Sequence, residues 1–240
     1  MKIRLGVVIP AYCEEENIAQ LCSQISEIIP SAKILVVDDS PNELSVMAIN
    51  NLGIPNVRII HRGAKSGRGS AVLFGMAELL ESDVDTVLEI DADFSHPPAQ
   101  IPELVEFAIS RDTDLLIASR YLKTSEIKGW PLSRRAFSLL ANRLARICLQ
   151  VPVRDYTNGY RLYSNRAAKE IVSSCGKLGD GFIILSESLV TLFFKGFKVE
   201  EVPTVFVNRV RGVSSLGYKE VFSAAKGLMK ITLLRIKLQR

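Results

Sequence analysis

The chain has 240 residues, of which 48% are hydrophobic and 23% charged, enough to bury the core of one globular α/β domain. Its formal net charge is only +4, which is less basic than is typical of a nucleic-acid-binding protein, so no nucleic-acid partner is expected. The four cysteines show no CxxC spacing and no paired histidines, which argues against zinc and for reduced thiols in a cytosolic protein. No uncharged stretch approaches the ~20 residues of a membrane span, so the chain is not expected to cross a membrane by itself.

The first half of the chain alternates short β-branched runs with helical patterns. Strands that are apolar on both faces and alternate with helices indicate a mostly parallel sheet flanked by helices. The predicted strands are 5–9, 33–37, 57–60, 86–90 and 115–118, and the predicted helices are 14–29, 45–51, 70–80 and 101–110.

The second half is less regular. Its pattern predicts a helix at 132–149, a loop around 155–159, a helix at 186–194 and a strand at 199–207. An amphipathic helix is expected to start near Tyr218. Since no repeat or linker interrupts the chain, we expect a single catalytic domain over 1–217, followed by a basic C-terminal helix over 218–240.

The C-terminal segment is basic and partly apolar, which suits an anionic partner such as a phosphate or a lipid headgroup. An apolar stripe beside Lys226 and Lys230 predicts peripheral attachment to a membrane surface. The alternative is that this stripe packs on the protein's own core. The stripe consists of Val221, Phe222, Ala225, Leu228, Met229 and Leu233.

Four polar clusters fall where predicted strands end. They are residues 10–14, 38–40, 91–96 and 119–120. In an open parallel sheet, ligands bind outside the carboxyl ends of the strands. The coincidence of four such clusters therefore predicts one site at this edge.

Asp91 and Asp93 follow an apolar strand and are separated by one residue. Two carboxylates at this spacing can share a hard divalent cation that also binds substrate phosphates. The alternative is a strand-ending turn, in which aspartate is common. His96 is expected to support such a ligand set, or to mark a helix entry with the prolines that follow it.

Asp38 and Asp39 have the same two interpretations, a strand-ending turn or acceptors for a ribose or base. The glycine-rich segment 63–69 is no phosphate loop of the GxxxxGK[ST] kind. Its Lys65 and Arg68 are nonetheless candidates for phosphate contacts, with a flexible turn as the alternative.

Taken together, these segments resemble the family 2 glycosyltransferases, and specifically the dolichyl-phosphate mannose synthase group. The similar pieces occur in the family's order and cover most of the chain from residue 5 to about 217. They are 8–18 (VIPAYCEEENI), 36–40 (VVDDS), 91–98 (DADFSHPP), 119–121 (SRY), 130–134 (WPLSR), 141–142 (AN), 155–163 (DYTNGYRLY) and 206–214 (FVNRVRGVS).

The resemblance implies a GT-A (Rossmann-like) fold and transfer of mannose, with inversion, from GDP-mannose to a polyprenyl or dolichyl phosphate. It also implies roles for individual residues. Asp91 and Asp93 would hold Mg²⁺ or Mn²⁺, with Ser95 as a third contact. The nucleotide would lie against Pro10, Tyr12, Glu14, Asp38, Asp39, Lys65 and Asp91. Phosphates would face Arg120, Arg134, Arg209, Arg211 and Ser214, and Asp155 would lie on the acceptor side. The catalytic residues would be Asp93, Arg120, Arg134 and Asp155.

The chemistry agrees with this assignment. Transfer to an alcohol needs a general base, whereas a phosphate monoester is already anionic and can attack without one. The protein then has to supply a cation for the departing diphosphate, and arginines that bring two anions together. Arginines 120, 134, 154, 161 and 209 are the candidates for that work.

Four positions, in three motifs, depart from the family's usual pattern. Ser215 stands where many relatives have lysine, Asn158 and Tyr160 stand where serine and phenylalanine are commoner, and Ser95 replaces a longer glutamine. These changes keep other readings open: a GT-A transferase with GDP-glucose, UDP-glucose or another donor, a non-lipid acceptor, a nucleotidyltransferase, or a non-catalytic sugar-nucleotide-binding subunit. The expected location is the cytosolic face of a membrane, reached peripherally or through a membrane-anchor subunit.

Overall fold

A seven-stranded sheet organises the chain, and the computed structural model describes residues 3–179, 181, 183–208 and 218–239. The elements in chain order are β1 (Leu5–Ala11), α1 (Glu15–Ile28), β2 (Lys33–Asp38), α2 (Leu44–Asn50), β3 (Val57–His61), α3 (Arg68–Leu80), β4 (Thr86–Glu89), the 3₁₀ turn η1 (Pro98–Gln100), α4 (Ile101–Arg111), β5 (Leu115–Ser119), β6 (Glu126–Lys128), α5 (Leu132–Leu149), β7 (Arg161–Ser164), α6 (Asn165–Ser174), α7 (Ile183–Phe194), β8 (Val199–Pro203), β9 (Val205–Val207) and α8 (Tyr218–Leu238).

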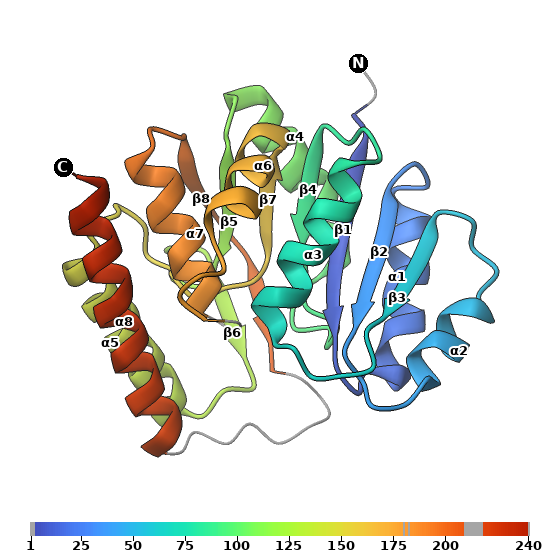
Figure 1. The fold of residues 1–240 in the computed structure, drawn as a ribbon, viewed down its shortest axis with the longest axis horizontal. Coiled ribbons are helices and arrows are strands. Elements are labelled where there is room, and N and C mark those ends of the chain that lie inside the picture. The colour runs from blue at the N-terminus through green and yellow to red at the C-terminus, as the bar shows by residue number, and fades with distance from the viewer. Residues whose placement is uncertain (1–2, 180, 182, 209–217, 240) are drawn as a thin grey trace.

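The strand order is β3-β2-β1-β4-β7-β5-β8, and every pair is parallel except those that involve β7. The order runs outward in both directions from β1, with β2 on one side and β4 on the other. Loops that leave such a pair diverge to opposite faces, which opens a crevice at the carboxyl ends of the two strands. The segment after Ala11 and the segment after Glu89 both start at this crevice (Figure 1).

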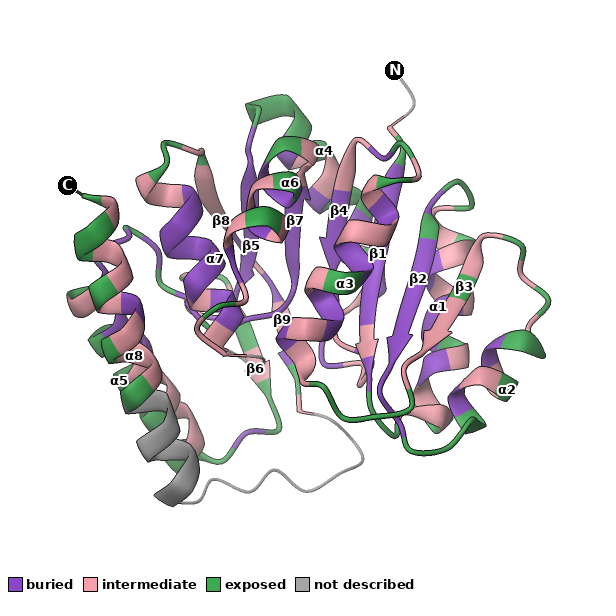
Figure 2. Ribbon diagram, in the orientation of Figure 1, coloured by how far each residue is buried: buried purple, intermediate pink, exposed green. Residues whose placement is uncertain are grey.

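Both faces of the sheet are covered. In β1, Val8 belongs to the core beneath α3, α6 and α7, whereas Val7 and Ile9 belong to the core beneath α1 and α4. This alternation follows from the two-residue period of a strand, and it explains why the strands are almost uniformly apolar. Figure 2 shows the central strands as the most buried part of the molecule.

Helix α7 is apolar almost all round, which would be unusual for a helix on the surface. It lies between the sheet and the C-terminal helix, in contact with α6 and α8, so nearly its whole circumference is covered (Figure 1). Among the described helices, none has the length and apolarity that crossing a bilayer needs.

The predicted mostly parallel α/β sheet is confirmed, with two local differences. Sequence patterns missed β7, a four-residue strand that lies antiparallel between β4 and β5. The strand predicted at 199–207 is interrupted at Thr204, so that β8 joins the main sheet and β9 pairs with β6 in a small second sheet. Because β7 is antiparallel, its amino end, and with it the loop before Arg161, lies at the same edge as the carboxyl ends of its neighbours.

Helix α3 packs closely on β1 and β2 through Gly75. A Cβ at this position would overlap Val8 Cγ2 and lie 2.9 Å from Val37 Cγ2. The absence of a side chain therefore fixes the distance between the helix and the sheet, and with it the place where α3 begins.

We predict that Gly75→Ala lowers the free energy of unfolding by about 1–3 kcal/mol, because the added methyl group overpacks this contact. Urea denaturation followed by circular dichroism measures the change. Glu78→Ala, at a partly exposed position on the same helix, is the control and should lower stability by less. Equal stability of Gly75→Ala and the unmodified protein would contradict the close packing.

Candidate active site

The carboxylates at the end of β2 are buried and already engaged. Asp38 is fully buried, and its Oδ2 lies 2.8 Å from His61 Nδ1 at the end of β3. Asp39 accepts two hydrogen bonds from Arg62, at 2.6 and 2.8 Å, and one from the Ser66 backbone at 3.0 Å. The two side chains thus fix the loop after β3, and sequence patterns did not identify either partner.

The other residues predicted to bind the nucleotide lie around this loop. Tyr12 follows β1 and is 42% exposed, and Lys65 Nζ lies 4.3 Å from the centre of its ring. Pro10 lies in β1, in register with Val37, and Glu14 directly precedes α1. An exposed aromatic ring with a cation above it forms a surface on which a base could stack.

Asp91 and Asp93 lie directly after β4, as predicted. Both Nε and Nη2 of Arg68 donate to Asp91 Oδ1, at 2.9 and 2.6 Å. Removal from bulk water disfavours the charged form of Asp91, but Arg68 outweighs this effect and holds the pKa of Asp91 below its usual range. Asp93 Oδ1 accepts a hydrogen bond of 3.0 Å from the Ser95 backbone, which closes the turn.

The donor set at this turn suits a hard divalent cation. Aspartate carboxylates and a serine hydroxyl offer oxygen ligands of the kind that Mg²⁺ and Mn²⁺ prefer. Within the described ranges, no group of three or more His, Cys, Asp or Glu residues is arranged to hold a metal ion. A cation at Asp91 and Asp93 would therefore take its remaining ligands from phosphate oxygens, water and Ser95.

His96 is enclosed behind this turn. It is 1% exposed, and neither ring nitrogen has a hydrogen-bond partner. Burial lowers the pKa of His96 to about 4, so the ring is neutral at pH 7. Its ring packs 4.9 Å from that of Tyr160 and 5.2 Å from that of Phe206.

Arg120 and Asp155 form a buried ion pair. The Arg120 guanidinium donates to both carboxylate oxygens of Asp155, at 2.8 and 2.7 Å, and to the Thr157 hydroxyl at 2.7 Å. Asp155 is fully buried and also accepts bonds from the backbone of Arg120, Thr157 and Asn158. Burial opposes the ionisation of Asp155, but Arg120 and these bonds hold its pKa below the usual range. Asp155 therefore positions Arg120 and is not available as a general base.

Trp130 connects two arginines. The Arg134 guanidinium lies 4.3 Å from the centre of the Trp130 ring, and that of Arg120 lies 5.6 Å from it. Phe206 packs edge-on against Trp130 at 5.1 Å and also contacts His96. A continuous aromatic layer therefore joins the segment after Asp93 to the two cations.

Of the remaining residues predicted to bind phosphate, Arg161 has another role in the structure, and several others are not described. Arg161, expected among the phosphate-binding arginines, is fully buried, and its guanidinium donates to the carbonyls of Tyr156, Asn158 and Leu185. It therefore holds the 155–159 loop and cannot meet a substrate phosphate. Arg209, Arg211, Ser214 and Ser215 lie outside the described residues.

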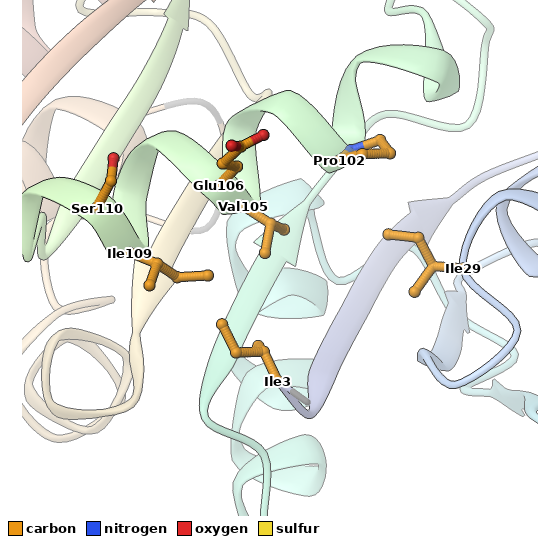
Figure 3. A pocket seen from close by; sticks show the side chains of 7 residues that line it. All are labelled: Ile3, Ile29, Pro102, Val105, Glu106, Ile109 and Ser110. Carbon is orange, nitrogen blue, oxygen red and sulfur yellow. The ribbon is translucent and has the colours of Figure 1, made fainter. Parts of the chain in front are cut away.

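A hollow of about 450 Å³ lies at the opposite, amino-terminal edge of the sheet, between the ends of α1 and β1 and one side of α4 (Figure 3). Its lining is apolar apart from Glu106 and Ser110. With one acid and no cation, it is unsuited to a nucleotide or a phosphate.

Comparisons with known proteins agree with this fold and identify the family. Residues 6–172 match the glycosyl transferase family 2, and the chain belongs to this family. The polyprenol monophosphomannose synthase of Mycolicibacterium smegmatis is 33% identical over 225 residues, or 92% of this chain and 84% of that protein. The dolichol-phosphate mannosyltransferase of Pyrococcus furiosus is 33% identical over 234 residues, or 95% of this chain and 64% of that protein.

Among solved structures, the glucosyl-3-phosphoglycerate synthase of Mycobacterium tuberculosis, in complex with Mn²⁺, UDP and phosphoglyceric acid, has a TM-score of 0.71. It is 18% identical, and the match covers 97% of this chain and 78% of that one. The expected GT-A fold and the resemblance to family 2 glycosyltransferases are therefore confirmed, and the protein is a glycosyltransferase enzyme.

We predict that Asp155→Asn lowers the free energy of unfolding by about 3–5 kcal/mol, because it leaves the buried Arg120 cation without its counter-ion. Urea denaturation measures the loss. Asp83→Asn is the control: Asp83 pairs with Arg4 at the surface, its side chain is 81% exposed, and its loss should leave stability nearly unchanged. If the two variants are equally stable, Asp155 does not carry the role assigned to it.

Proposed function

We propose that the enzyme transfers a hexose, with inversion, to a polyprenyl phosphate of the dolichyl type, and that its donor is GDP-mannose. The observation that carries this proposal is that Arg120 and Arg134 both lie against Trp130, which Phe206 and His96 join to the Asp91–Asp93 turn. A site with carboxylates for a cation on one side and two arginines on the other suits a reaction between two phosphorylated substrates. The names of the two mannosyltransferase relatives support the same acceptor class and sugar.

On the donor side, Asp91 and Asp93 are the proposed ligands of Mg²⁺ or Mn²⁺, with Ser95 close by. A cation held there would neutralise charge on the departing nucleoside diphosphate. Tyr12 and Lys65 are proposed to contact the nucleotide, and Asp38 and Asp39 to shape its pocket from behind. A solved neighbour of the same fold is in complex with Mn²⁺ and UDP, which supports a nucleotide and a divalent cation as the ligands proposed here.

On the acceptor side, the proposed phosphate ligands are Arg120 and Arg134, to which the chain after Asn208 would add Arg209, Arg211 and Ser214. Arg120 is held by Asp155, so its guanidinium is preorganised and loses little freedom when an anion arrives. The acceptor phosphate carries its own negative charge and needs no base. The two carboxylates at the turn and the neutral His96 then have no proton to remove.

The decisive experiment offers labelled GDP-mannose, GDP-glucose, UDP-glucose and UDP-N-acetylglucosamine to the protein with polyprenyl phosphate and Mg²⁺ or Mn²⁺. We expect labelled lipid from GDP-mannose, and its loss on chelation of the metal or in Asp93→Asn, by a factor of about 10²–10³ or more. If labelled lipid forms only from a different donor, the proposed sugar or nucleotide is wrong. If labelled lipid forms from none of the donors, the proposed function is wrong.

Access to a lipid acceptor is proposed to come from one apolar face made by α5 and α8, which lie side by side (Figure 1). Leu228 and Ile231 of α8 pack on the protein's own core, whereas Met229 and Leu233 are 61% and 62% exposed. The core contacts agree with the alternative that this helix packs on the protein's own core, while the exposed side chains leave an apolar surface for the proposed membrane contact. Val221, Phe222 and Ala225 of the predicted stripe lie outside the residues whose side chains the structure describes. Helix α5 adds exposed Leu132, Phe137, Leu139, Leu140, Leu144 and Ile147.

Exposed cations accompany this face, including Arg143, Arg146, Lys226 and Lys237. Apolar side chains flanked by cations are the composition of a helix that lies in the interface of an anionic membrane. We therefore propose peripheral attachment at the cytosolic face, by residues 132–149 and 218–240 together. A membrane-anchor subunit is the alternative occupant.

We predict that the full chain floats with vesicles that contain anionic phosphatidylglycerol, and that the double variant Leu140→Glu with Leu144→Glu floats several-fold less, because buried carboxylates oppose insertion. The matched control is Met47→Glu, which removes a 59% exposed apolar side chain from α2 at the other end of the sheet. Equal flotation of all three proteins would argue against this face.

A further inference from the structure

Arg68 is a largely buried cation that contacts the turn carrying Asp91. It is the first residue of α3, and its side chain is 11% exposed. Two of its nitrogens donate to Asp91 Oδ1, and Nη1 donates to Glu89 Oε1 at 2.6 Å. One guanidinium is thus shared between a proposed metal ligand and a second carboxylate.

Glu89 has no place in the proposed reaction, yet it is a charged residue in a strand that is otherwise apolar. It is 1% exposed, and its Oε2 accepts a 3.0 Å hydrogen bond from the Tyr163 hydroxyl on the neighbouring strand. A buried carboxylate is costly unless it is paired, and Arg68 supplies the counter-charge. Glu89 in turn draws one of the Arg68 donors away from Asp91.

The 155–159 loop leaves room for this arrangement. A Cβ on Gly159 would overlap Arg68 Nη2 and lie 2.9 Å from Arg68 Cζ. The same Cβ would lie 3.2 Å from Asp91 Oδ2. Helix α3, strand β4 and this loop therefore converge on one guanidinium, so its position is determined from three sides.

We propose that Arg68 is a resident counter-cation that competes with the divalent cation for Asp91, and that Glu89 sets the strength of this competition. The inference rests on the proposed metal role of Asp91 and Asp93. Arg68 satisfies Oδ1 and lowers the negative charge that a metal ion meets. The divalent cation accordingly binds weakly to the protein alone and strongly only with a nucleoside diphosphate, which brings further oxygen ligands. Arg68 is here a residue that controls metal affinity, and it carries no step of the reaction.

Two variants separate this role from a merely structural one. Glu89→Gln keeps the shape and can still accept from Tyr163, but it directs the whole guanidinium charge to Asp91. The double variant Arg68→Met with Glu89→Gln removes one charge of each sign, so the net charge of the cluster is unchanged while Asp91 loses its internal partner. The two variants are expected to change metal affinity in opposite directions.

The experiment titrates the full-length protein with Mn²⁺ alone and then with Mn²⁺ and GDP, and follows bound metal by electron paramagnetic resonance. Without nucleotide, we expect Glu89→Gln to raise the Kd for Mn²⁺ roughly tenfold, because one negative charge near the ion is lost. We expect the double variant to lower the Kd roughly tenfold, because Asp91 loses its internal partner while the net charge of the cluster stays the same. In the presence of GDP, the Kd values of the three proteins for Mn²⁺ should differ less, because the diphosphate adds oxygen ligands. Circular dichroism melts establish that each variant is folded.

Asp93→Asn serves as the control for the metal site itself. If unmodified protein binds Mn²⁺ and Asp93→Asn does not, but Glu89→Gln and the double variant have the unmodified affinity, the role of Arg68 is wrong and the proposed metal site stands. If the unmodified protein binds no Mn²⁺ with or without GDP, the metal site is wrong, and the inference about Arg68 falls with it.

Discussion

Three arginine–carboxylate pairs at the carboxyl edge of the sheet determine what can bind there. Arg62 with Asp39, Arg68 with Asp91, and Arg120 with Asp155 each connect a loop to a strand end. Charges that are buried or largely buried are costly unless paired, so each pair holds its loop in one position. Charges held in fixed positions consequently border the crevice between β1 and β4.

The pairs differ in what they leave for a ligand. Asp39 accepts hydrogen bonds from Arg62 and from the Ser66 backbone, and these bonds hold the loop after β3. Asp155 is wholly used in holding Arg120, whose guanidinium also faces the ring of Trp130. In the proposed reaction, an incoming diphosphate would be met by an added divalent ion, because Asp39, Asp91 and Asp155 are already paired with arginines, whereas an incoming phosphate monoester would meet Arg120 and Arg134. The Asp91–Asp93 turn and the two arginines at Trp130 thus form two separate environments at one edge of the sheet, as the proposed reaction between two anionic substrates requires.

Much of this architecture is predictable from the sequence, because the alternation of apolar strands and amphipathic helices specifies a doubly covered parallel sheet. The strand-end clusters could likewise be predicted to meet, since parallel strands end at one edge. Strand β7 could not, because four residues that include Arg161 and lie between a loop and a helix carry no periodic signal. The break at Thr204 was hidden because valines occur on both sides of it.

Within the site, the aspartates were predictable but their partners were not. Which arginine pairs with which carboxylate depends on loop geometry, which sequence patterns do not predict. The residues around Arg161 suggested phosphate binding, whereas its guanidinium donates to backbone carbonyls. One signal was available. Glu89, a charge inside an apolar strand, requires a buried counter-ion, and Arg68 is that ion.

The central claim is that the Asp91–Asp93 turn and the two arginines around Trp130 hold the two substrates face to face. A crystal structure with GDP, Mn²⁺ and a short-chain polyprenyl phosphate tests it most directly. We expect Mn²⁺ about 2.2 Å from oxygens of Asp91 and Asp93 and of the diphosphate, with the acceptor phosphate bonded to Arg120 and Arg134. A metal bound elsewhere, or an acceptor phosphate away from both arginines, would contradict it.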